Sequence, residues 1–388
     1  MTSIEWVKNA DGSQGLTWNP IRGCTRVSPG CGGPGPHGGC YAEGIAARFS
    51  GPGQPYEGLA VMKGGKPRWT GKLAFVESAL MLPLRRKKPT TWFVNSMSDL
   101  FHESVPDAWI DRVFAVMTLC PQHTFQVLTK RSARMRAYMA RLDAVEDTAW
   151  LQDPRRPNCA KQVRWCLEAY TAQTAGMPFQ EHLQQAWPLP NVWLGVSAED
   201  QRRADERVPD LLATPAAVRF VSAEPLLGPI DFTRISLGMK PGYVLGEDGQ
   251  PDRPEMFKVV RDALMDTGGD FERLDWIIVG GESGPSARPM HPAWARSIRD
   301  QCAAAGVAYH FKQHGAWAAI DQSAGADEAG WQGRGDWMIL SADGDLDIPD
   351  DRWPDEAAGE VAVVRVGKKA AGRLLDGVEW NQMPEVSR

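Results

Sequence analysis

The sequence has no apolar run of about 18 residues, the length that a membrane-spanning helix needs. Its first residues, MTSIEWVKNADG, lack the apolar core segment of a signal peptide. It also lacks a basic excess, because 43 Lys and Arg stand against 48 Asp and Glu, which gives a net charge of −5. We therefore expect a cytoplasmic protein with no membrane partner, and not a nucleic-acid-binding protein with a broadly basic surface.

Cysteine is scarce, with seven residues in 388, yet three lie in the short stretch GCTRVSPGCGGPGPHGGCYAE (23–43). Structural disulfides are rare in a reducing compartment, so clustered thiols there indicate metal binding or catalysis. Glycine and proline in the two gaps permit the sharp bends that would bring Cys24, Cys31 and Cys40 together. These three residues are the predicted metal ligands.

Short apolar runs rich in β-branched residues alternate with helical patterns. The predicted strands lie within 90–101, 124–131, 191–200, 218–228, 274–284 and 307–315, and two of the helices lie within 106–120 and 291–306. Such alternation predicts an α/β fold, a partial or full parallel (β/α) barrel of the TIM type. We expect one domain over 1–388, with insertions at about 143–188, 232–270 and 316–360 and a C-terminal segment at 361–388.

Polar residues follow each predicted strand, and in a parallel barrel these carboxyl ends build the active site. The candidates are Ser96, Ser98, Asp99, Thr129, Lys130, Ser197, Glu199, Glu224, Glu282 and Lys312. Glu224, Glu282 and Lys312 can alternatively pair with one another, since buried charges need partners. The three-thiol stretch follows a strand-like segment at 15–23, so it belongs to the same mouth.

Two metal sites fit three clustered thiols. Three thiolates leave one iron of a four-iron cluster without a protein ligand. Alternatively, His37 supplies a fourth ligand and closes a Cys3His zinc site. The spacing of the ligands allows both, whereas a position at the barrel mouth favours the cluster.

Taken together, the motifs resemble those of radical S-adenosylmethionine (radical SAM) enzymes. More closely, the chain is similar to a phage-associated three-cysteine-motif family of unknown function. The matching stretches include WNPIRGCTRVSPGC, CYAE, FVNSMSDLFHESVP, VWLGVSAEDQ, FVSAEPLLGPI, WIIVGGESG and GKKAAGRLLDGVEWNQMP. The spacing C-x6-C-x8-C departs from the usual C-x3-C-x2-C, and the Gly-Gly-Glu run at 280–282 lies on a late strand rather than the second.

The resemblance implies a barrel of the radical SAM type, with a [4Fe–4S] cluster on the three cysteines, S-adenosylmethionine on its open iron and an external reductant. Ser96, Ser98 and Asp99 would hold the methionyl ammonium. Thr129 and Lys130 would hold its carboxylate or a substrate phosphate, and Ser197 and Glu199 the ribose. Glu224, Glu282 and Lys312 would then be catalytic residues at the substrate end.

The same resemblance implies a substrate and a setting. FQVLTKR (125–131) is similar to the spore photoproduct lyase branch, which points to modification or repair of nucleic acid or a nucleotide in phage or mobile-element biology. A partner protein encoded nearby is also implied. The alternative is a non-catalytic, zinc-stabilised protein that binds nucleic acid or assists assembly.

Overall fold

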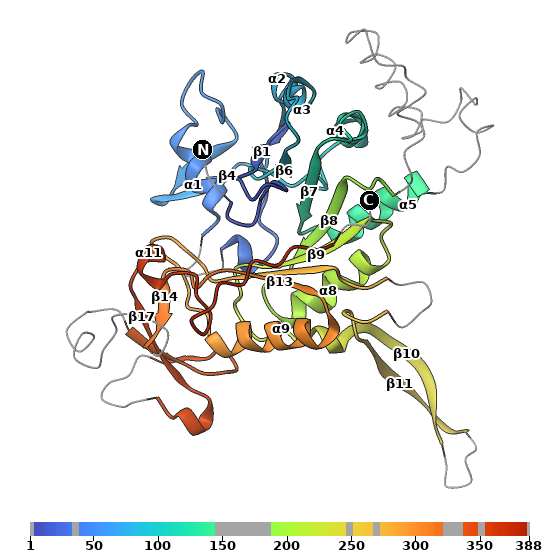
Figure 1. Ribbon diagram of the computed structural model, residues 1–388, viewed down its shortest axis with the longest axis vertical. Helices are drawn as coiled ribbons and strands as arrows, with labels where there is room; N and C mark the ends of the chain where they lie inside the picture. The colour runs from blue at the N-terminus through green and yellow to red at the C-terminus, as the bar shows by residue number, and fades with distance from the viewer. Residues whose placement is uncertain are drawn as a thin grey trace.

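The computed structural model describes residues 4–32, 39–143, 188–245, 251–266, 272–320, 337–347 and 354–385. They fold around a seven-stranded sheet with the strand order β1-β6-β7-β8-β9-β12-β13 (Figure 1), in which all neighbours are parallel. Its strands are β1 (Leu16–Trp18), β6 (Thr91–Val94), β7 (Thr124–Thr129), β8 (Val192–Ser197), β9 (Val218–Ala223), β12 (Trp276–Gly280) and β13 (Ala308–Gln313). Because this order follows the chain, each strand is added beside the previous one, as in a barrel.

Helices flank this sheet and follow its strands in sequence. They are α1 (Tyr41–Arg48), α2 (Glu77–Leu80), α3 (Leu82–Arg85), α4 (Asp107–Thr118), α5 (Ser132–Asp143), α8 (Gln201–Leu212), α9 (Pro292–Ala305) and α11 (Lys368–Ala371). No helix in the described ranges combines the length and the apolar character needed to cross a membrane. The predicted α/β class is confirmed, and the parallel sheet is a half-barrel compatible with a partial TIM-like fold.

Each of the six predicted strand runs contains one strand of the sheet, and the two predicted helices are α4 and α9. Helix α9 shows how proline and glycine in the sequence predict the two ends of a helix. Its Pro292 occupies the first turn, where no backbone N–H is needed, and Gly306 ends it in the left-handed conformation at φ 66°.

Smaller elements are attached to the half-barrel. Three strand pairs are β2 (Ile21–Arg22) with β5 (Ala74–Phe75), β3 (Ala60–Lys63) with β4 (Lys66–Trp69) and β10 (Ile235–Leu245) with β11 (Pro251–Arg261). A four-stranded sheet has the order β14 (Trp317–Ala319), β17 (Val361–Arg365), β15 (Trp337–Leu340) and β16 (Leu346–Asp347). There are also 3-10 turns at η1 (Pro29–Cys31), η3 (Phe232–Arg234) and η5 (Glu356–Ala358).

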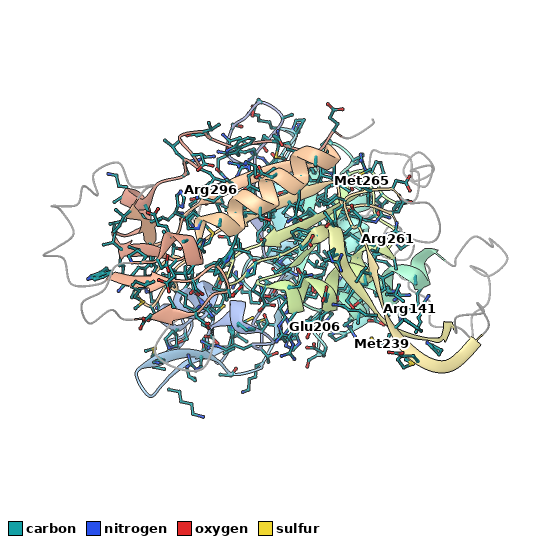
Figure 2. All side chains as sticks on the ribbon, turned by 90° about the horizontal axis from the view of Figure 1, so that it is seen from below. Arg141, Glu206, Met239, Arg261, Met265 and Arg296 are labelled. Carbon is teal, nitrogen blue, oxygen red and sulfur yellow. The ribbon has the colours of Figure 1, made fainter. Side chains whose placement is uncertain are left out.

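The expected insertions correspond to different parts of this structure. Almost all of 143–188 lies outside the described residues. The 232–270 segment contains β10–β11, an arm that extends away from the sheet (Figure 1) and carries Met239 on its surface (Figure 2). The described parts of 316–360 and 361–388 together form the β14–β17 sheet, so those two segments are one structural unit.

Alternation along the strands divides the inner face of the half-barrel into an aromatic floor and a polar rim. On β9, Phe220 belongs to the inner apolar cluster, and Ser222 and Glu224 follow it at two-residue intervals toward the carboxyl end. Trp6, from the amino-terminal segment, fills the floor. Its ring lies 5.0 Å from that of Phe93 and 5.7 Å from that of Trp276.

Replacing Trp6 with alanine is predicted to lower the free energy of unfolding by about 3–5 kcal/mol, the usual cost of truncating a buried large aromatic side chain. Trp6 is only 2% exposed, so the cavity would open inside the half-barrel. Urea denaturation followed by circular dichroism measures this loss, and W6F serves as the conservative control with a smaller loss. A W6A protein within about 1 kcal/mol of wild type would show that Trp6 does not support the floor.

Candidate functional site

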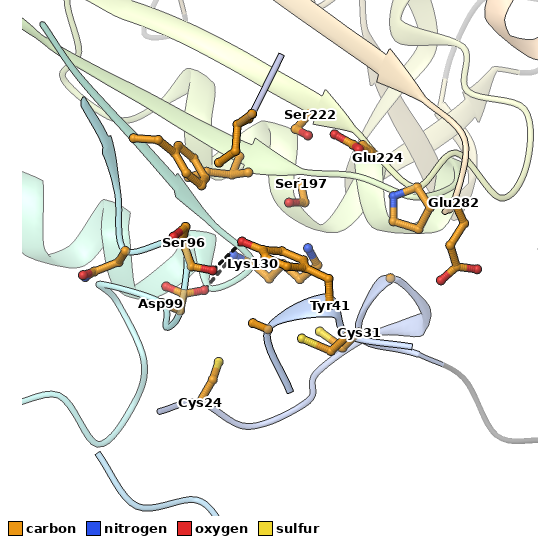
Figure 3. A pocket seen from close by; sticks show the side chains of 18 of the residues that line it. Cys24, Cys31, Tyr41, Ser96, Asp99, Lys130, Ser197, Ser222, Glu224 and Glu282 are labelled. Carbon is orange, nitrogen blue, oxygen red and sulfur yellow. Dashed lines mark hydrogen bonds between the residues drawn. The ribbon is translucent and has the colours of Figure 1, made fainter. Parts of the chain in front are cut away.

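A cavity of about 360 Å³ opens at the carboxyl edge of the parallel sheet, within the range of about 300–1,000 Å³ typical of small-molecule sites. Its floor includes Trp6 and Phe93. Its walls include all three clustered cysteines and every predicted polar tip residue except Glu199 (Figure 3). The structure therefore brings together residues that are separated by almost 290 positions in the sequence.

The cysteines approach this cavity from different points of one irregular segment, residues 24–40, which we call the thiol loop. Cys24 follows β2, Cys31 ends η1, and Cys40 precedes the first residue of α1. All three are free thiols, and Cys24 and Cys31 enter from separate stretches of the loop (Figure 3). Within the described ranges, no group of three or more His, Cys, Asp or Glu side chains is arranged to hold one metal ion. His37, proposed for the zinc alternative, lies outside those ranges.

The first contact that holds the thiol loop is a buried ion pair between Asp99 and Arg131, with 3.0 Å between Oδ2 and Nη1. Asp99 also accepts hydrogen bonds from Thr129 Oγ1 at 2.7 Å and from the backbone N–H of Lys130 at 3.0 Å. Arg131 donates to the carbonyl of Thr25 at 3.0 Å, and its Nη1 lies 3.8 Å from Cys24 Sγ. Asp99 thus positions the start of the loop, and its oxygens are occupied by protein donors.

A second buried pair joins Glu199 to Arg207 at 2.9 Å. The other carboxylate oxygen of Glu199 accepts from Ser28 Oγ and, at 3.1 Å, from the backbone N–H of Gly30. Only glycine fits at position 30, because a Cβ there would collide with that carboxylate. Burial raises the pKa of Glu199, but the charges of Lys130 and Arg207 and the Ser28 hydrogen bond leave it below its ordinary value.

Two further carboxylate–arginine pairs hold other described residues of the thiol loop. Glu282 accepts from Arg288 Nε at 2.8 Å and from the backbone N–H of Gly39 at 3.3 Å, next to Cys40. Glu43 on α1 accepts from Arg26 Nε at 3.0 Å. Both arginines also donate to loop carbonyls, Arg288 to Pro29 at 2.9 Å and Arg26 to Gly32 at 3.0 Å. Four buried carboxylates therefore fix the segment that carries the thiols.

One wall of the cavity presents donors that the described residues leave available. Lys130 Nζ forms no hydrogen bond or ion pair with any described residue. The side-chain amide nitrogen of Asn95 is buried without a hydrogen-bond partner, and its residue has a φ of 59°, a conformation that asparagine tolerates. The hydroxyl-bearing Ser197 and Ser222 line the same wall. An anionic ligand group with several hydrogen-bond acceptors would pair with the donors of this wall.

The part of the cavity wall beside Ser222 carries alternating charges. Lys312 Nζ contacts a carboxylate oxygen of Glu224 and lies 3.8 Å from one of Glu5. Lys368 contacts the other oxygen of Glu5. Burial raises the pKa of Glu5, but the hydrogen bond from Lys368 and the charge of Lys312 bring it below the ordinary value. The predicted Glu224–Lys312 pairing is therefore present, without Glu282, which pairs with Arg288.

The remaining predicted hydroxyl groups hold the strand tips in place. Ser96 Oγ donates to the side-chain oxygen of Asn19 at 3.1 Å, and Ser98 Oγ donates to the carbonyl of Ile21 at 2.9 Å. Thr129 Oγ1 donates to Asp99 and accepts from the backbone N–H of Arg131. These protons are already donated inside the protein, so the three residues position the cavity wall.

The thiols of Cys24 and Cys40 are protonated in the absence of a metal. Burial raises the pKa of Cys24 to about 12, with a further increase from the Asp99 carboxylate and a decrease from the Arg131 guanidinium. Burial likewise raises the pKa of Cys40. Metal binding to such thiols must displace protons.

Sequence reasoning missed Asn95 and the arginine partners of the carboxylates. Asn95 stands one residue before the predicted Ser96, and Arg131 directly follows Lys130, so their proximity to a strand tip was the available signal. Arg207 lies on α8, the helix that begins just after its partner Glu199, and Arg288 lies in the loop that follows its partner Glu282. Nothing in the sequence assigns them to those partners.

The family comparison matches nearly the whole chain. The family model DUF5131, described as a protein of unknown function, matches residues 1–384. No curated protein and no solved structure matches the chain. The matched range includes the thiol loop, the parallel sheet and the C-terminal β17.

Replacing Glu199 with glutamine is predicted to lower the free energy of unfolding by about 3 kcal/mol, because it leaves Arg207 buried without its counter-charge. Amide hydrogen exchange at residues 28–31 should accelerate, since the anchor of η1 is weakened. The matched control is E206Q on α8, the helix that carries Arg207, at the molecular surface (Figure 2), where the loss should stay below about 1 kcal/mol. Equal losses in the two variants would show that Glu199 does not anchor the loop.

Proposed function

We propose that this chain, which belongs to the DUF5131 family, is a radical SAM-type iron–sulfur enzyme that modifies or repairs nucleic acid or a nucleotide. The observation that carries the proposal is the placement of three free thiols on one anchored loop, at a cavity on the carboxyl edge of a parallel half-barrel. The phage or mobile-element setting rests on the sequence resemblance, as does the nearby partner protein.

The donor set fits a [4Fe–4S] cluster. Such a cluster takes each thiolate on a different iron, so its ligands stand farther apart than those of one tetrahedral ion. Cys24, Cys31 and Cys40 all line the cavity, which places the three thiols that such a cluster needs at one site. When bound and reduced, a cluster of this kind supplies the electron for reductive cleavage of S-adenosylmethionine.

The free donors of the cavity wall suit the polar end of S-adenosylmethionine. Lys130 offers an ammonium to the methionyl carboxylate, and the Asn95 amide offers a second hydrogen bond. Ser197, on the neighbouring strand, is available to a ribose hydroxyl. Asp99 and Glu199, which the resemblance placed on the ligand, are assigned to positioning the thiol loop instead.

The charged wall is the proposed substrate end. Glu224 and Lys312 form a pair that can exchange a proton with a bound group, and Glu5 lies within 3.8 Å of the same ammonium. The aromatic floor excludes water below them. Glu282 holds Arg288 and the loop, so its contribution is to position Cys40 rather than to contact substrate.

Anaerobic reconstitution tests the cluster. The wild-type chain should contain about four iron and four sulfide per chain. C24A, C31A and C40A should each lose the cluster, whereas C120A, which removes a buried thiol of the core, should retain it. Addition of dithionite and S-adenosylmethionine should then release 5′-deoxyadenosine.

Two results would reject the proposal. One is a single zinc per chain without sulfide, together with loss of that zinc in H37A. The other is a cluster that persists in all three cysteine variants. The cluster proposal requires that H37A leave the iron and sulfide content unchanged.

Binding of S-adenosylmethionine to the reconstituted protein tests the cavity wall. K130M should weaken binding roughly tenfold to a hundredfold, the effect of losing a charged hydrogen bond worth about 1.5–3 kcal/mol. K87M, which removes an exposed charge before β6, is the matched control and should bind like wild type. Isothermal titration calorimetry measures both constants, and equal affinity for the two variants would remove Lys130 from the ligand site.

A further inference from the structure

The segment between α1 and α2 is basic although the chain as a whole is acidic. Residues 49–76 contain four basic side chains, Lys63, Lys66, Arg68 and Lys72, and one acidic residue, Glu57. This gives a local net charge of +3 in a chain whose net charge is −5. A concentration of one sign against the overall charge marks a surface for a partner of opposite sign.

The β3–β4 hairpin orders three of these cations on one face. Gly64 and Gly65 form its turn with φ values of 56° and 72°, as a two-residue hairpin turn requires. The register pairs Lys63 with Lys66 and Val61 with Arg68, so all four side chains project from the same face. The hairpin therefore groups three cations on one face, where a polyanion can contact them; Arg68 also lies 4.0 Å from a carboxylate oxygen of Glu43.

The other face of the same hairpin connects it to the cavity. Ala60 packs with Ala42 and Ala46 of α1 in a small apolar cluster, to which Trp69 also contributes. Trp69, the last residue of β4, lines the cavity and donates its backbone N–H to Glu43 at 3.1 Å. The hairpin stands beside α1 (Figure 1). Its cations are thus attached to the element that follows Cys40.

Aromatic side chains lie where the basic hairpin meets the cavity. Tyr41 is 54% exposed and lines the cavity, and its hydroxyl donates to the carbonyl of Ser96 at 2.5 Å, which fixes the ring. Trp69 lies at the same rim. Cations near an exposed ring are the pattern by which proteins bind single-stranded nucleic acid, with phosphates on the cations and a base on the ring, here that of Tyr41.

We propose that the β3–β4 hairpin binds the phosphate backbone of a single-stranded nucleic acid and delivers one base past Tyr41 to the cavity. This extends the proposed function, because it names a nucleic-acid strand, rather than a free nucleotide, as the substrate. Recognition relies on phosphates and stacking, so binding depends on salt and tolerates different sequences. Base pairing would have to be absent or broken at the delivered base.

Fluorescence anisotropy with labelled 12-nucleotide strands of mixed sequence tests the hairpin. Parallel arms with DNA and RNA of the same sequence identify the strand, and the salt concentration is varied from 50 to 300 mM. The double variant K63A/K66A should reduce the slope of log affinity against log salt by about 1.4, from two lost contacts, and weaken binding more than tenfold at low salt.

The matched control removes two exposed cations at the opposite end of the sheet. R85A/K87A changes residues before the start of β6, at its amino edge, away from the cavity. Its affinity and salt slope should remain those of wild type, and thermal unfolding should show that both double variants are folded. Equal loss in the two double variants, or absence of binding to both strands by the wild-type chain, would overturn the proposal.

The wild-type chain, assayed before and after reconstitution, separates this inference from the enzymatic proposal. It should bind the strand in both states, because the cations do not depend on the iron. Strand binding by a chain that takes up no iron or sulfide on reconstitution would leave the hairpin assignment standing and reject the radical chemistry. A reconstituted cluster in a chain that does not bind the strand would reject the hairpin assignment and leave the radical chemistry standing.

Discussion

The structure depends on four buried carboxylates that each hold an arginine and a part of the thiol loop. The loop has one 3-10 turn and no other regular structure among its described residues, so its own backbone does not fix the cysteines. The cysteine positions are fixed instead by four carboxylates and their arginine partners, namely those of Asp99, Glu199, Glu282 and Glu43. Removing one partner from a buried pair leaves an uncompensated charge, so separating the two side chains costs much free energy and the pair holds its geometry. This organisation suits a loop whose geometry must be set before a cofactor arrives.

The half-barrel explains why the anchors and the free donors lie together. Three of the four carboxylates come from the carboxyl ends of strands or from the residues just after them, and the inner face of those strands carries the cavity wall. Lys130, directly after β7, and Ser197, the last residue of β8, face inward by simple alternation above the aromatic floor. The same tips therefore support the loop with some side chains and offer others to a ligand.

The sequence was sufficient to predict the fold class and the members of the cavity, but not their separate roles. Buried strands ending in polar residues identify the mouth of a parallel sheet, and nine of the ten predicted tip residues line it. Glu199 and Lys130 look alike as charged residues after strands. Only the structure shows that Glu199 is enclosed by Arg207, Ser28 and Gly30, whereas the side-chain ammonium of Lys130 has no hydrogen-bond or ion-pair partner among the described residues. The choice of an arginine partner depends on packing between distant segments. The β10–β11 arm also gave no clear signal, because, apart from Ile235, its described side chains are exposed or half-buried.

A crystal structure of the anaerobically reconstituted chain, with anomalous data at the iron edge, tests the account most directly. The account predicts iron density in contact with the sulfur atoms of Cys24, Cys31 and Cys40, with one iron free of protein ligands and open to the cavity beside Lys130. The four carboxylate–arginine pairs should be unchanged. A lone ion bound with His37 outside the cavity, or sulfur atoms that share no metal, would contradict it.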